Sequence, residues 1–187
     1  MRLANLLGAL ATGLTGSVNG ATSAAAELDE AAATALIALL DFSPRGIRSD
    51  PQSGCRPDPL RNRSPRRCLV NAGYVAKRPG RDARLRSPIL TASGARVAQR
   101  VRIAREGAIA RHLGKLSDIE RATLTWLCER LVGALTKQRL EQRSAGFTPA
   151  GGALCRMCDF GTCGRDQGIC PATEAARSRS GGPIDAD

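Results

Sequence analysis

Aromatic residues are scarce in this chain of 187 residues, which has one Trp, one Tyr and three Phe, or 3% of the sequence. Hydrophobic residues still make up 42%, so Leu, Ala, Val and Ile must supply the core, and this composition favours packed helices over a β-sandwich. The scarcity also excludes the aromatic platforms on which single-stranded nucleic-acid binders stack bases.

Histidine is almost absent, since His112 is the only one. A Ser-His-Asp hydrolase and a His-rich catalytic metal site both need more, so we expect no enzyme. His112 lies near a predicted helix end, where a surface or capping role is expected.

Long apolar runs are also missing. The first 16 residues resemble a signal peptide in part, but leucines recur there at helical steps of three and four, at Leu3, Leu6, Leu7, Leu10 and Leu14. No stretch approaches the roughly 20 apolar residues of a membrane span. We therefore expect a cytoplasmic protein with no membrane association.

Acidic residues are few: the chain has 17 Asp and Glu but 28 Lys and Arg, which gives a net charge of +11. Such an excess suits a polyanionic partner, because basic residues placed on phosphates release counterions. The alternative is a basic surface that serves only solubility.

Four helices are predicted from periodicity and caps. They cover residues 2–19, residues 29–40, residues 92–113 behind the N-cap Thr91, and a long helix from Asp118 to the glycines at 146–152. Ser117 and Glu120 form a capping box at the start of the last helix. Its apolar stripe is Leu124, Leu127, Leu131 and Leu135, and Cys128 beside it is expected to be buried.

Residues 46–68 break this pattern, with four prolines and six arginines. We expect neither helix nor strand there, because an internal proline costs a helix about 3 kcal/mol or more. Regular structure is predicted again from Leu69. Residues 74–78 and 85–90 are predicted to form the strands of a basic hairpin, and residues 79–82 have a sequence typical of a turn. Pro88 restricts the second strand to the edge of a sheet.

The hairpin carries a short motif, D-x-R, five residues, then L-T-x-x-G, formed by Asp82, Arg84, Leu90, Thr91 and Gly94. This motif resembles the wing of winged-helix regulators of the multiple-antibiotic-resistance (MarR) type, and the resemblance covers about residues 2–140. It implies a mainly α, winged helix-turn-helix fold over residues 1–145, with a wing at 74–90 and dimerisation through the first and the C-terminal helices.

The resemblance implies a homodimeric transcriptional regulator that binds duplex DNA. Its DNA contacts would come from basic residues of the wing, which are Lys77, Arg78, Arg81, Arg84 and Arg86. Asp82 would orient Arg84 in the minor groove. A solvated charged hairpin is the alternative. A small-molecule effector is an expectation of the resemblance alone.

The chain departs from this family at residues 46–68, where the recognition helix belongs. Back-translated and read one nucleotide later, residues 49–67 can encode RTLSRVVGLTHSGTVRLVD, a string with the periodicity of a helix-turn-helix. We interpret the segment as a compensated frameshift, which impairs sequence-specific readout and leaves Cys55 and Cys68 without a role. The coding DNA decides this.

Four cysteines gather near the C-terminus, at Cys155, Cys158, Cys163 and Cys170. Four thiols within 16 residues suit a closed tetrahedral site, so a structural zinc ion in a knuckle over residues 153–172 is the leading expectation. An iron-sulfur cluster, or disulfides and free thiols, are the alternatives. A tail over residues 173–187 is expected to be disordered.

Two further functions stay open at this stage. One is a redox- or metal-responsive protein built around the four cysteines, and the other is a defective subunit that pairs with intact relatives and blocks them.

Overall fold

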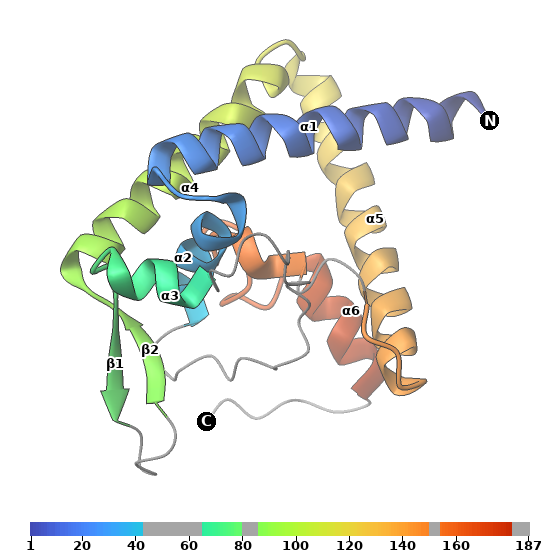
Figure 1. The fold of residues 1–187 in the computed structure, drawn as a ribbon. Helices are drawn as coiled ribbons and strands as arrows, with labels where there is room; N and C mark the ends of the chain where they lie inside the picture. Colours follow the sequence, from blue (N-terminus) through green and yellow to red (C-terminus); the bar gives the residue numbers. More distant parts are fainter. Residues whose placement is uncertain (43–64, 80–85, 150–153, 181–187) are drawn as a thin grey trace. The chain divides into compact units, whose positions relative to one another are not determined.

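The fold of this chain is given by a computed structural model, which describes residues 1–42, 65–79, 86–149 and 154–180. Within these residues it has six α-helices and one two-stranded antiparallel sheet (Figure 1), so the prediction of a mainly helical chain with a small hairpin is confirmed. The chain divides into two compact units between Lys115 and Leu116. The domain predicted over residues 1–145 includes the described part of the first unit and the beginning of the second.

The first unit is built on three helices, α1 (Arg2–Ala26), α2 (Glu30–Phe42) and α4 (Ala92–Leu113). α1 packs against α4 and α2, and α2 packs against α4. Leu36, Ile37 and Val101 are its largest fully buried apolar side chains. α1 runs beyond the predicted end at residue 19 because its last turns are rich in alanine, the strongest helix former.

A short helix, α3 (Pro65–Asn71), corrects the prediction that residues 46–68 hold no helix. Pro65 is the first residue of α3, where its missing N–H is no loss and its fixed φ favours the helix. Leu69 is buried, and α3 contacts α2 and the first strand. The rest of that segment, residues 46–64, lies outside the described residues.

The hairpin consists of β1 (Val75–Pro79) and β2 (Arg86–Leu90), which pair antiparallel from Val75 opposite Leu90 to Pro79 opposite Arg86. The predicted strands, residues 74–78 and 85–90, differ from these by one residue at each end except the last, which is residue 90 in both. Pro88 is opposite Lys77, in a sheet where both strands are edges, as predicted for a proline in a strand.

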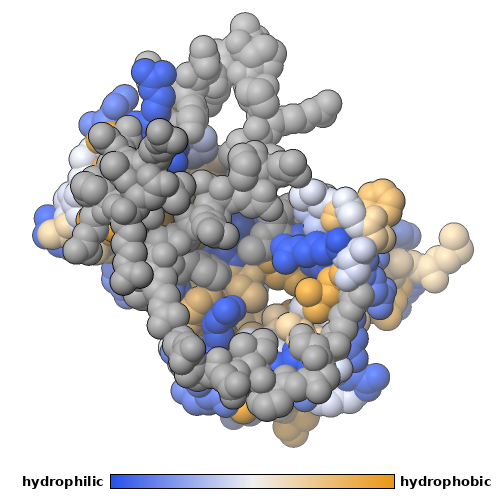
Figure 2. Space-filling model, turned by 90° about the horizontal axis from the view of Figure 1, so that it is seen from below, coloured by the Kyte–Doolittle hydropathy of each residue, from blue (hydrophilic) through white to orange (hydrophobic). Residues whose placement is uncertain are grey.

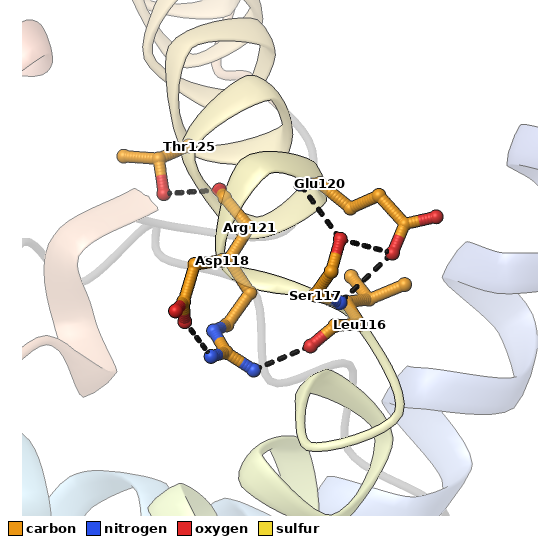
Figure 3. Close-up of polar contacts among 6 residues, drawn as sticks. All are labelled: Leu116, Ser117, Asp118, Glu120, Arg121 and Thr125. Carbon is orange, nitrogen blue, oxygen red and sulfur yellow. Dashed lines mark hydrogen bonds and ion pairs between the residues drawn. The ribbon is translucent and has the colours of Figure 1, made fainter.

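The second unit begins with α5 (Asp118–Ser144), and its predicted capping box is confirmed (Figure 3). The Ser117 N–H donates to Glu120 Oε2 at 2.8 Å, and the Glu120 N–H donates to Ser117 Oγ at 3.4 Å. Arg121 adds an ion pair with Asp118 and donates to the Leu116 carbonyl at 2.5 Å. These bonds fix the first residue of α5.

After α5 come a 3-10 helix, η1 (Leu154–Met157), and α6 (Pro171–Ser180), which packs against α5. The prediction of a disordered tail from residue 173 is wrong as far as Ser180, because this stretch continues the helix that begins at Pro171. Alanines give α6 a buried face, with Ala172 and Ala175 less than a tenth exposed. Residues 181–187 lie outside the described part of the chain.

Candidate functional site

The base of the hairpin is tied to α4 by a network centred on Thr91. The Thr91 N–H donates to the Tyr74 carbonyl at 3.0 Å, and its hydroxyl donates to the Gly73 carbonyl at 2.7 Å. Thr91 Oγ1 also accepts from the Gly94 N–H at 3.0 Å, which makes it the N-cap of α4 as predicted. Thr91 therefore caps the first turn of α4 and also binds Gly73 and Tyr74, the two residues that precede β1.

Gly94 has a steric role in the same place. A Cβ at this position would lie 2.0 Å from the Tyr74 carbonyl oxygen and 2.8 Å from the Tyr74 carbonyl carbon. Only a residue without a side chain lets the first turn of α4 approach the chain that enters β1 so closely. Thr91 and Gly94 of the L-T-x-x-G sequence thus fix the hairpin to α4.

The basic residues assigned to DNA fall on or beside this hairpin. Lys77 and Arg78 lie on β1, and Arg86 begins β2 opposite Pro79. The remaining predicted residues, Arg81, Asp82 and Arg84, belong to residues 80–85, outside the described residues, so the orientation of Arg84 by Asp82 stays a prediction.

An ion pair that the sequence analysis missed joins α2 to α4. Arg102 Nη2 donates to Asp41 Oδ2 at 2.5 Å, and the two side chains are 11% and 16% exposed. Removing one partner of such a pair is costly, because the other charge stays largely buried without compensation. Each residue alone gives no signal in the sequence, since the pair forms only when the helices pack.

Two helices expose apolar faces. On α1 these are Leu3, Leu6, Leu7 and Leu10, and on α5 they are Ile119, Trp126, Leu127, Leu131 and Leu135, each of them more than two-fifths exposed. α5 has no buried residue at all, so the prediction that Cys128 is buried is wrong in the single chain. Figure 2 shows apolar residues, in orange, at the surface among hydrophilic ones. His112 is exposed, as expected.

The four clustered cysteines lie on η1 and the turns that lead to α6. The Cys158 N–H donates to the Cys155 carbonyl at 3.0 Å, so these two residues share one turn. A second turn system joins the other two, with Gly164 and Gly168 at positive φ of 73° and 76°. The Ile169 N–H donates to the Gly164 carbonyl at 3.0 Å, which returns the chain towards Cys170.

The Cys163 thiol donates a weak hydrogen bond to the Phe160 carbonyl, with an S–O distance of 3.8 Å. A hydrogen bond from the Cys158 thiol, helped by the positive charge of Arg165, lowers the pKa of the Cys155 thiol to about 6 despite its partial burial. Burial and the nearby thiols raise the pKa of Cys163. The Arg165 guanidinium lies 4.5 Å from the centre of the Phe160 ring.

Among the described residues, no group of three or more His, Cys, Asp or Glu is arranged to hold a metal ion. A search of the same residues finds no helix with both the length and the apolar character needed to cross a membrane. No family model, curated protein or solved structure matches the chain.

Proposed function

We propose that this chain is a transcriptional regulator that binds duplex DNA as a homodimer, through the basic hairpin between α3 and α4. The observation that carries the proposal is the coupling of that hairpin to α4 by Thr91 and Gly94, at the positions of the wing motif. A hairpin fixed at its base can present its basic residues to a groove in a constant orientation.

Charge supports the same partner. The net charge of +11 favours a polyanion, and the hairpin segment holds Lys77, Arg78, Arg81, Arg84 and Arg86 within ten residues. The narrow minor groove of A-tract DNA concentrates negative potential and attracts an inserted arginine. With the recognition-helix segment altered, binding depends mainly on phosphate and groove contacts and is strongly sensitive to salt.

The exposed apolar faces of α1 and α5 support the homodimer. Monomeric proteins rarely leave large apolar residues together at the surface, and a helix with such a stripe buries it against a partner. Two-fold symmetry would place two hairpins on DNA about one helical turn apart.

Arg84→Ala tests the role of the hairpin. Duplex affinity, measured by fluorescence anisotropy over a series of salt concentrations, should fall, and the slope of log affinity against log salt should shrink by about one. Lys115→Ala removes the same charge from an exposed turn outside the hairpin and should change affinity less. If Arg84→Ala and Lys115→Ala give the same affinity and slope as the unaltered chain, the hairpin does not bind DNA.

A further inference from the structure

The second unit has very little apolar core for its length. Its buried hydrophobic residues among the described ones are Phe160, Cys170, Ala172 and Ala175, and α5 buries none. Alanine contributes little apolar area, and units with cores this small are usually stabilised by disulfides, metals or oligomerisation. Packing alone therefore does not account for the fixed turns between η1 and α6.

The four cysteines occupy the place where such a stabiliser would act. Cys155 and Cys158 lie on one turn, and Cys163 and Cys170 are joined by the turns at Gly164 and Gly168. Cys170 is buried and its carbonyl accepts from the Glu174 N–H at 2.9 Å, so it begins the first turn of α6. A group bound to all four thiols would connect η1 directly to α6.

We propose that Cys155, Cys158, Cys163 and Cys170 bind one Zn²⁺ ion as a tetrathiolate site that ties η1 to the start of α6. In the described conformation the four cysteines do not yet form such a group, so binding would draw the turn of Cys155 and Cys158 together with the turns between Cys163 and Cys170. Each cysteine binds the ion as a thiolate, so every thiol that is still protonated exchanges its S–H bond for a Zn–S bond and releases its proton to solvent, with no change in oxidation state. Every coordination position is then filled, so the ion is structural and leaves no place for a substrate.

This site is independent of DNA binding, so each proposal can fail without the other. The test begins with the full chain purified without oxygen, in which metals are counted by mass spectrometry of the elements and thiols by alkylation. We expect one zinc per chain. Replacement by Co²⁺ should give the strong sulfur-to-cobalt charge-transfer absorbance and the visible bands of a tetrahedral tetrathiolate.

Two variants sharpen the test. Cys163→Ser should weaken the charge-transfer absorbance and loosen metal binding, whereas Cys128→Ser removes a cysteine on α5 outside the cluster and should keep one zinc and an unchanged cobalt spectrum. Hydrogen exchange of the unaltered chain gives a second measurement, which does not depend on the folding of Cys163→Ser. Chelation of zinc should speed exchange across residues 171–180 and leave α4 unchanged.

Three results would overturn the zinc site. Brown protein that contains iron and acid-labile sulfide would show an iron-sulfur cluster in its place. Four cysteines recovered as two disulfides, or as free thiols with no bound metal after incubation with Zn²⁺, would show that the cluster binds no metal. Equal exchange of α6 with and without zinc would show that the ion does not hold this helix.

Discussion

Gly94 shows how one residue can decide whether the hairpin keeps its place. Gly94→Ala should destabilise the fold by about 1–3 kcal/mol, because the new methyl group would overlap the Tyr74 carbonyl unless the backbone moves. Gly107 provides a matched control on the same helix, since it is exposed and a Cβ there meets nothing within 4 Å.

Thermal or urea unfolding of both variants measures the effect. Gly107→Ala should stabilise the chain by roughly 0.5–1 kcal/mol, since alanine is the better residue inside a helix. Two variants with equal stability would contradict the close approach of α4 to Tyr74. DNA affinity of Gly94→Ala should also fall, since the same shift displaces the hairpin.

The sequence predicts Gly94 as part of the L-T-x-x-G motif, but it does not show that the Tyr74 carbonyl lies too close for any side chain there. Thr91 was predicted as an N-cap from residue type alone, and its bond to the Gly94 N–H confirms this. Its second bond, to the carbonyl of Gly73, joins residues 18 apart in the chain. Local patterns carry no information on such tertiary contacts, which is also why the Arg102–Asp41 pair was missed.

At the scale of an element, the start of α5 should respond to pH. Hydrogen bonds from the Ser117 hydroxyl and N–H lower the pKa of Glu120 below its usual value of 4.5. The ionised form of the Glu120 carboxylate is therefore more stable in the folded chain than in the unfolded chain, which lacks these hydrogen bonds. Its stabilising effect is complete above the pKa of the unfolded chain and is lost as the pH falls through the lower pKa of the folded chain.

Glu120→Gln gives the comparison, because glutamine can still accept the Ser117 N–H but does not titrate in this range. Thermal unfolding followed by circular dichroism at a series of pH values should show the unaltered chain to be the more stable near neutral pH. The gap between the two should close in acid, while all other carboxyl groups affect both alike. Curves that stay parallel down to acid pH would contradict the bond between Glu120 and Ser117.

Elements with a strong local signal were predictable, and those that depend on packing were not. The helices of residues 92–113 and 118–144 have side-chain N-caps, and both begin where predicted. α3 and α6 were missed because each begins with a proline in polar, arginine-rich sequence. The first is supported by contacts with α2 and β1, and the second by contacts with α5.

For the whole molecule, the exposed stripe of α5 should determine the oligomeric state. Leu131 is 47% exposed, so Leu131→Glu should have little effect on the stability of a single chain. A charge at the centre of a dimer interface is expensive to bury, and we expect a loss of about 2 kcal/mol, roughly thirtyfold in the dimer dissociation constant. Sedimentation at several protein concentrations measures it.

Gln138→Glu supplies the control, since it adds the same charge at an exposed polar position of α5 and should leave the dimer unchanged. Identical sedimentation of the two variants and the unaltered chain would exclude this stripe from any dimer contact. The sequence predicted the stripe correctly from leucine spacing. It could not show that the single chain leaves the stripe exposed, because leucines at this spacing also form the buried face of a helix inside a single chain.

The central claim is that a dimer of this chain binds duplex DNA through basic residues. Sedimentation velocity with a fluorescent duplex, from low to high salt, tests both parts in one measurement. The account predicts that at low salt two chains sediment with each duplex, and that the complex dissociates as salt rises. A chain that sediments as a monomer and leaves the duplex free even at low salt would contradict it.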